Sequence, residues 1–235
     1  MILTIAAVFL LIFGIAAYQE NNGNFTINLN LYDRRRGLTL SEDAGMTRLS
    51  SKLYATPLQQ AEPITMDTDQ GAQSIDWSII DAEGSRGANN GEHHIVYTFY
   101  LKNVGEQTFN YAVSLDILSK ARGVEKATWV AVYRDSIYYG HPSNIRLRTI
   151  YALESQTQED GIERGEYNPD SVYADAKFES ERLVFSDRRN AFSPGETHKY
   201  TVVIWLEGED PECKLERSGG MIKLEMNFAV ISEVT

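Results

Sequence analysis

The sequence predicts an all-β protein: a jelly-roll-like antiparallel β-sandwich preceded by a single N-terminal transmembrane or signal helix. Residues 1–18 carry no charge, and roughly 17–25 apolar residues suffice for a helix to cross a bilayer. After residue 24, about ten short segments are rich in β-branched and aromatic residues or alternate apolar with polar side chains, as strands do. We expect no further helix, and many short strands at regular intervals favour a sandwich over a βαβ fold.

Three parts are expected along the chain: residues 1–18 as a transmembrane anchor or signal segment, residues 19–24 as a polar tether, and residues 25–235 as the sandwich domain. The apolar run lies at the lower end of the length that spans a bilayer, and it is longer than the usual apolar region of a signal peptide, about 7–15 residues. A retained anchor and a cleaved signal therefore both remain open. In either case residues 1–18 would contact a membrane.

The first predicted strand covers residues 25–31 and alternates strictly. Phe25, Ile27, Leu29 and Leu31 share one face, and Asn and Thr residues occupy the other. The apolar face alone sets the register of such a strand. Because it follows a polar tether, this strand is the candidate element for pairing with a neighbouring molecule.

The middle of the chain contains further strand signals. Residues 74–80 alternate, and residues 94–103 and 108–117 form two clear strands joined by a short turn. A connection of this length predicts an antiparallel hairpin. A second hairpin is expected at residues 128–140, turning at Asp135. Weaker strands are expected at residues 146–152 and 182–186, a long loop at residues 42–73 and a surface excursion at residues 154–171.

The last third of the chain carries the strongest pattern. Pro194 and Gly195 predict a type II turn before a buried strand at residues 198–206. An acidic turn follows, and then an alternating strand at residues 221–228 with one apolar and one polar face. These segments indicate a sheet that is buried on one side.

Composition limits the function. The formal net charge is −11, and an acidic body repels nucleic acid and anionic lipid. Cys213 is the one cysteine of the chain, so no disulfide can form within it and the core must be held by packing. We therefore expect no nucleic-acid partner.

The C-terminal block resembles the signature of the TasA/camelysin family of Gram-positive surface and biofilm-matrix proteins. The resemblance rests on residues 200–208 (YTVVIWLEG), residues 210–213 (DPEC), the pair Gly219 and Gly220, residues 97–103 (YTFYLKN) with Gly105, and residues 194–196 (PGE). It implies a jelly-roll core, export to the cell surface or medium, and a structural role. Some family members form fibres by lending an N-terminal strand to a neighbour, which would be the strand containing Phe25, Ile27, Leu29 and Leu31 here.

Candidate sites for metals and catalysis are weak. The camelysin branch has been classed with metallopeptidases, but the chain has no His-Glu-x-x-His motif. His93 and His94 are adjacent and would point to opposite faces of a strand, and His141 and His198 lie in other segments. We expect no catalytic residue and no cofactor. Calcium prefers several oxygen ligands close together, and its weak candidates are the carboxylates of the acidic turn: Glu207, Glu209, Asp210 and Glu212.

The leading hypothesis is an exported structural or interaction protein of the bacterial surface or matrix, with an extracellular domain tethered to the cell membrane or a secreted body. It would assemble with itself or with related surface proteins by β-strand addition. The alternatives are a camelysin-like metal-dependent peptidase and a glycan- or peptide-binding module. The binding module would use a face of tyrosines: Tyr97, Tyr100, Tyr133, Tyr138 and Tyr139.

Overall fold

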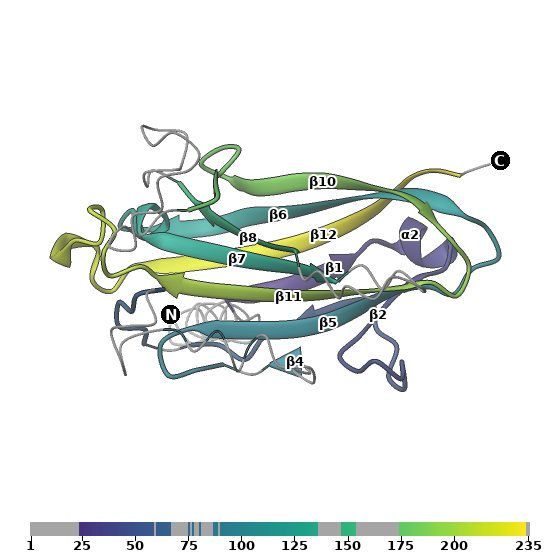
Figure 1. Cartoon of the computed structure of the whole chain (residues 1–235), viewed down its shortest axis with the longest axis horizontal. Coiled ribbons are helices and arrows are strands. Elements are labelled where there is room, and N and C mark those ends of the chain that lie inside the picture. The colour runs from purple at the N-terminus through teal and green to yellow at the C-terminus, as the bar shows by residue number, and fades with distance from the viewer. Residues whose placement is uncertain are drawn as a thin grey trace, which may run out of the picture.

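Two β-sheets pack face to face, and their strands run along the long axis of the molecule (Figure 1). The computed structural model describes residues 24–58, 60–66, 75, 77, 80, 87–88, 90–135, 147–153 and 174–233. Sheet A contains, in order, β10 (Leu183–Phe192), β6 (Phe109–Ala121), β12 (Met221–Glu233), β1 (Phe25–Leu29) and β3 (Lys52–Tyr54). Sheet B contains, in order, β2 (Leu38–Ser41), β5 (Ile95–Asn103), β11 (Thr197–Leu206), β7 (Thr128–Asp135), β8 (Leu147–Ala152) and β9 (Ala176–Lys177), and β4 (Gly87–Ala88) pairs with β5. The predicted all-β sandwich is confirmed.

The expected anchor or signal segment, residues 1–18, and most of the tether lie outside the described residues. Within the part of the chain that the structure describes, no helix is long and apolar enough to cross a membrane. A short helix that the sequence did not predict, α2 (Leu31–Arg35), follows β1. Two 3-10 turns, η2 (Val124–Lys126) and η4 (Leu215–Arg217), lie in loops.

The main core fills the space between the sheets and follows the alternation of the strands. In β6, every second residue from Phe109 to Ile117 is buried, and in β12 the same holds for Leu224, Met226 and Phe228. Sheet B contributes the facing side chains, among them Phe99 and Tyr200, whose rings stack with centroids 5.5 Å apart. Burial of this apolar face drives the pairing of the sheets.

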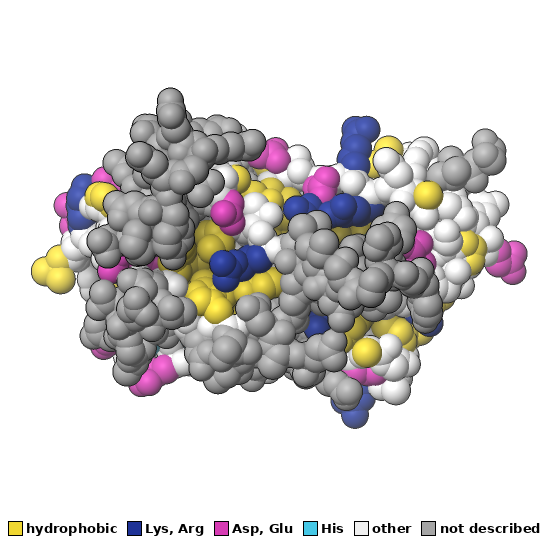
Figure 2. Space-filling model, in the orientation of Figure 1, with side chains coloured by type: hydrophobic (Ala, Val, Ile, Leu, Met, Phe, Trp, Pro, Cys, Tyr) yellow, Lys and Arg dark blue, Asp and Glu magenta, His cyan; other side chains and the backbone are white. Residues whose placement is uncertain are grey.

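A second apolar cluster covers the outer face of sheet B. It gathers Trp77, Trp129 and Trp205 with smaller residues of β7, β8 and β11. Figure 2 shows hydrophobic side chains in the middle of this side of the molecule, with charged side chains beside them. Both faces of sheet B are therefore apolar, which explains the continuous apolar run of β11.

The strand predicted at residues 74–80 is wrong where the structure describes it. Trp77 and Ile80 have helical backbone conformation, and both are buried together with Ile75. A short apolar run fits either period, and residues three apart share one face of a helix. Packing of Trp77 against Trp205 then favours the helical form.

The hairpin predicted for residues 94–103 and 108–117 is also wrong, because β5 and β6 belong to different sheets. The connection crosses the sandwich and is held by the buried side chain of Asn103. Its Nδ2 donates to the carbonyls of Gln107 (2.8 Å) and Phe192 (3.0 Å), and its Oδ1 accepts from the amide of Gly105 (2.9 Å). The Asn103 side chain therefore links the β5–β6 connection to the β10–β11 connection, which also passes from one sheet to the other.

Two further details differ from the sequence prediction. β7 continues through Asp135, where a turn was expected, and its antiparallel partner among the described strands besides β11 is β8. Residues 136–140 lie outside the described part. The turn at Pro194 and Gly195 is confirmed, and Gly195 has a φ of +79°, as position i+2 of a type II turn requires.

β1 is an interior strand of sheet A. It pairs in parallel with β12 and antiparallel with β3, with Phe25 opposite Leu224 and Leu29 opposite Phe228. The predicted strand ends two residues early, because Asn30 caps α2 by accepting a 2.9 Å hydrogen bond from the Asp33 amide. Leu31 is therefore on α2 and 61% exposed, and it does not share the buried face of β1.

Candidate functional site at the open end of the sandwich

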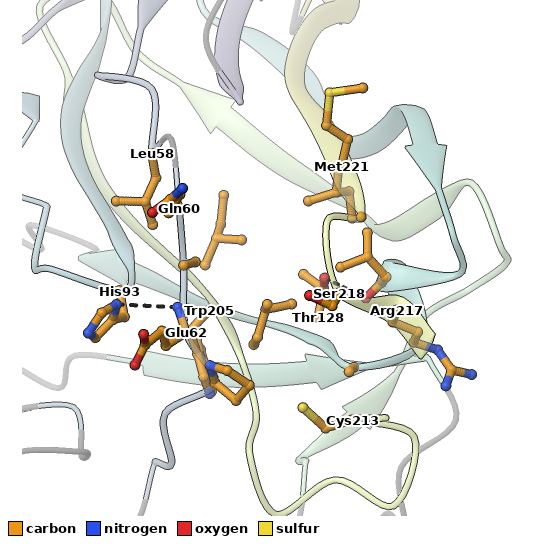
Figure 3. Close-up of a pocket in the computed structure, with 18 of the residues that line it drawn as sticks. Leu58, Gln60, Glu62, His93, Thr128, Trp205, Cys213, Arg217, Ser218 and Met221 are labelled. Carbon is orange, nitrogen blue, oxygen red and sulfur yellow. Dashed lines mark hydrogen bonds between the residues drawn. The ribbon is translucent and has the colours of Figure 1, made fainter. Parts of the chain in front are cut away.

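A cavity of about 620 Å³ opens between the two sheets at the end of the molecule where β5, β7 and β12 begin. Its lining is mostly apolar and comes from both sheets, with Ile95 and Ile204 from sheet B and Ile222 from sheet A. Polar side chains such as Gln60, Glu62, His93 and Ser218 lie at its border (Figure 3). This size lies within the range of ligand pockets, about 300–1,000 Å³.

One wall of the cavity is positioned by Asn24, the residue before β1. Its Nδ2 donates to the carbonyl of Ile222 (3.3 Å), and its Oδ1 accepts from the amide of Leu58 (3.2 Å). Its own carbonyl accepts from the amide of Leu224 (2.8 Å). Asn24 thus joins the start of β1, the start of β12 and the segment at Leu58.

The opposite wall is the loop between β11 and β12. Arg217 donates through Nε to the carbonyl of Gly123 (2.9 Å) and forms an ion pair with Glu212. A side chain at Gly220 would lie only 2.7 Å from Cβ of Val124. Glycine at that position lets the loop pack closely on the turn between β6 and β7.

Two exposed apolar side chains stand at the mouth of this cavity. Leu215, on η4, is 94% exposed and Met221 is 68% exposed. Among the described residues they are the two most exposed large apolar side chains. Neither was predicted from the sequence, and the signal that could have identified Leu215 is an apolar residue inside a charged loop.

The acidic turn has a structural role that sequence reasoning missed. Glu207 is fully buried, and its Oε2 accepts from the amide of Met66 and from the indole of Trp205, each at 2.9 Å. Asp210 is also buried and accepts from the indole of Trp129 at 2.7 Å. The two carboxylates hold the tryptophan cluster on sheet B.

The four calcium candidates do not form one cluster of ligands. Glu207 and Asp210 are directed into the protein, Glu209 is exposed, and Glu212 forms ion pairs with Lys214 and Arg217. Within the described ranges, no group of three or more His, Cys, Asp or Glu side chains is placed to hold a metal ion.

Burial changes the acidity of two groups near the cavity. Desolvation raises the pKa of Glu207, although the hydrogen bond from Trp205 acts in the opposite direction. Desolvation also raises the pKa of the half-buried Cys213 thiol, and the charge of Asp210 adds to the effect. The thiolate is the nucleophilic form of cysteine, so this environment lowers the reactivity of Cys213.

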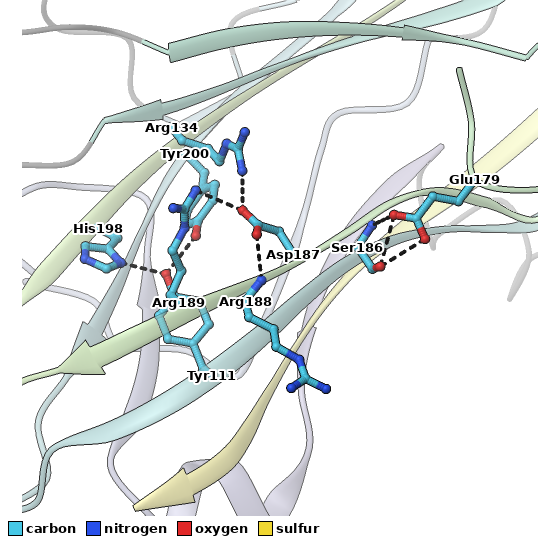
Figure 4. A network of polar contacts seen from close by, with 9 residues as sticks. All are labelled: Tyr111, Arg134, Glu179, Ser186, Asp187, Arg188, Arg189, His198 and Tyr200. Atoms are coloured by element: carbon cyan, nitrogen blue, oxygen red, sulfur yellow. Dashed lines mark hydrogen bonds and ion pairs between the residues drawn. The ribbon is translucent and has the colours of Figure 1, made fainter. Parts of the chain in front are cut away.

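The histidines occupy separate places. His93 borders the cavity and accepts from the amide of Glu62 (3.2 Å), and burial lowers the pKa of His94. His198 lies between the sheets, where its Nδ1 shares a 2.6 Å hydrogen bond with Tyr111 (Figure 4). Its Nε2 contacts Glu196 at 2.9 Å. His141 lies outside the described residues.

The polar network around His198 links the two sheets. Tyr111 of β6 shares a 2.8 Å hydrogen bond with Tyr200 of β11, and both side chains are buried. Nearby, Asp187 of β10 forms ion pairs with Arg134 of β7 and Arg189 (Figure 4). These contacts join the edge strand of sheet A to sheet B.

Five tyrosines were expected to line a binding face, and the structure describes three of them. All three described tyrosines are buried: Tyr97 in the main core, Tyr133 in the second cluster, and Tyr100 at a smaller pocket beside the turn at Pro194 and Gly195. Tyr138 and Tyr139 lie outside the described residues.

The four residues expected to mediate assembly lie in two different environments. Phe25, Ile27 and Leu29 are buried between the sheets, and Leu31 is exposed on α2.

No family model and no curated protein matches this chain. The function must therefore be argued from the cavity and from the position of β1.

Proposed function

We propose that the chain is an exported structural and interaction protein of the bacterial surface or matrix, membrane-tethered or secreted, that assembles by exchange of its first strand. The proposal includes a distant relationship to the TasA/camelysin family and a jelly-roll-like sandwich, and it assigns no catalytic role. The observation that carries it is the position of β1 in sheet A.

β1 joins the sheet through contacts that a second copy can supply equally well. It is the first described strand, it lies between β12 and β3, and its partner β12 is the last described strand. Its buried side chains are those of Phe25, Ile27 and Leu29 together with Thr26. A strand of this kind binds by main-chain hydrogen bonds and by side chains that fill pockets at alternate positions.

The energetics of strand exchange allow this interpretation. Burying one large apolar side chain contributes about 1.5–3 kcal/mol, so Phe25, Ile27 and Leu29 bind β1 firmly to whichever body it enters. The same contacts form whether β1 is inserted into its own sheet or into that of a neighbour, and exchange of an identical element is a low-cost route to assembly. Insertion into a neighbour at every step would produce a chain of molecules.

The test fixes β1 in its own sheet. Asn28 and Asn227 are opposite each other in the β1–β12 pairing and both are half-buried. Adjacent strands lie about 4.7–4.9 Å apart, which is within the range that a disulfide spans. In a Cys213→Ser background, Asn28→Cys with Asn227→Cys should form a disulfide that prevents exchange.

We expect the oxidised variant to remain folded and to form no assemblies by strand exchange. The reduced variant should form sedimenting assemblies, as the parent chain does. The single variant Asn28→Cys, treated in the same way, controls for oxidation. Assemblies that form equally well from the oxidised, fully cross-linked chain would overturn the proposal.

A further inference from the structure

The two most exposed large apolar side chains among the described residues, Leu215 and Met221, line the large cavity. This surface is separate from β1. Leu215 projects from η4 beside an opening lined by apolar residues such as Ile95, Ile204 and Ile222. Met221, at the start of β12, lines the same cavity (Figure 3). An apolar projection and an apolar cavity therefore occupy the same surface.

We propose that this surface, consisting of the cavity mouth with Leu215 and Met221, binds a second copy of the chain about a two-fold axis. In such a dimer each Leu215 enters the cavity of the other molecule. A projection and a cavity on one patch are self-complementary, and a two-fold contact of this type closes on itself. The dimer is thus distinct from the open chains that strand exchange would produce.

Charge favours a second copy as the occupant. The chain carries a net charge of −11, so most contacts between two copies are opposed by repulsion. Around Leu215, however, Lys214 and Arg217 alternate with Glu212 and Glu216, and these groups already form ion pairs. The side chains of Glu216 and Lys214 are 74% and 49% exposed, so a two-fold contact can place each near its opposite charge.

The cavity volume is also consistent with this occupant. A volume of about 620 Å³ is more than a single leucine side chain needs, so Leu215 of a second copy can enter. Filling an apolar cavity with apolar atoms removes surface from water on both molecules. Because the axis repeats the contact, each dimer contains two such insertions.

The experiment uses the purified full chain in a neutral detergent. Analytical ultracentrifugation over a range of concentrations should show a dimer. Leu215→Asp should raise the dissociation constant at least about a hundredfold, because two buried leucines are lost together. Leu49→Asp is the matched control, since Leu49 is an exposed leucine that does not line the cavity.

Several results would overturn the inference. One is a chain that stays monomeric at every concentration tested, including a monomer whose cavity instead takes up an apolar peptide. Another is a Leu215→Asp chain that dimerises like the parent. The oxidised Asn28→Cys, Asn227→Cys variant should retain this dimer in the ultracentrifuge. Loss of the dimer in that variant would assign it to strand exchange.

Discussion

The indole nitrogen of Trp129 donates a 2.7 Å hydrogen bond to the carboxylate of Asp210, and both side chains are buried. Trp205 makes the equivalent contact with Glu207 at 2.9 Å. Hydrogen bonds to charged acceptors are stronger than neutral ones, and a buried acceptor that loses its donors is costly. The acidic turn after β11 is therefore part of the second core, despite its charge.

Glu207→Gln should destabilise the fold by about 1–3 kcal/mol. The Glu207 carboxylate accepts hydrogen bonds from the Trp205 indole and from the main-chain amides of Met66 and Glu209. Glutamine would replace one of the two acceptor oxygens by an NH2 group, which would then face one of these donors. Urea unfolding followed by tryptophan fluorescence measures the change. Glu209→Gln, at an exposed position of the same turn, should leave the free energy of unfolding within about 0.5 kcal/mol. Equal effects of the two substitutions would contradict this role for Glu207.

Asn103→Ala should lower the free energy of unfolding by about 2–4 kcal/mol, because it leaves the buried carbonyl of Phe192 and other main-chain groups without their partner. The Asn103 side chain contacts both connections that cross between the sheets. Chemical denaturation provides the measurement, with Glu106→Ala in the same connection as the exposed control. A change below about 0.5 kcal/mol in Asn103→Ala would show that the crossings do not depend on this side chain.

Acidification should weaken the fold through His198. Burial lowers the pKa of His198 below its ordinary value of 6.5, although Glu196 acts in the opposite direction. The unfolded chain therefore binds a proton at higher pH than the folded chain does. The free energy of unfolding should fall as the pH drops below about 6.5, until the folded pKa is passed.

Denaturation curves at several pH values between about 7.5 and 5 test this expectation in the parent and in His198→Gln. The variant should show a smaller decline with falling pH, whatever its stability at neutral pH. His94, whose pKa burial also lowers, is present in both chains, so the difference isolates His198. Parallel curves would rule out a contribution from this group.

Local patterns in the sequence predicted the buried faces well. The alternation of Phe25, Ile27 and Leu29 indicated a strand with one buried face, and the structure confirms it. What the alternation could not predict is the partner, since β1 pairs with β12 at the other end of the chain. Period-two burial specifies which side chains face the core, whereas the pairing depends on contacts between distant segments.

Connections and buried charges were the least predictable features. A short turn after residue 103 serves a hairpin and a crossing between sheets equally well, and the hydrogen bonds of Asn103 decide in favour of the crossing. In the acidic turn, charge alone indicated a solvated loop or a calcium site. Glu207 instead continues the outward row of Val203 and Trp205 along β11, and that spacing is the signal that could have revealed its burial.

The most direct test of strand exchange uses two different chains in one sample. One carries Asn28→Cys and the other Asn227→Cys, both in the Cys213→Ser background, and they are mixed before assembly and then oxidised. Exchange of β1 predicts disulfide-linked pairs that contain one chain of each kind, because residues 28 and 227 are partners in the β1–β12 pairing. A mixture that assembles without forming such mixed pairs would show that β1 stays in its own sheet, and it would contradict the proposed mode of assembly.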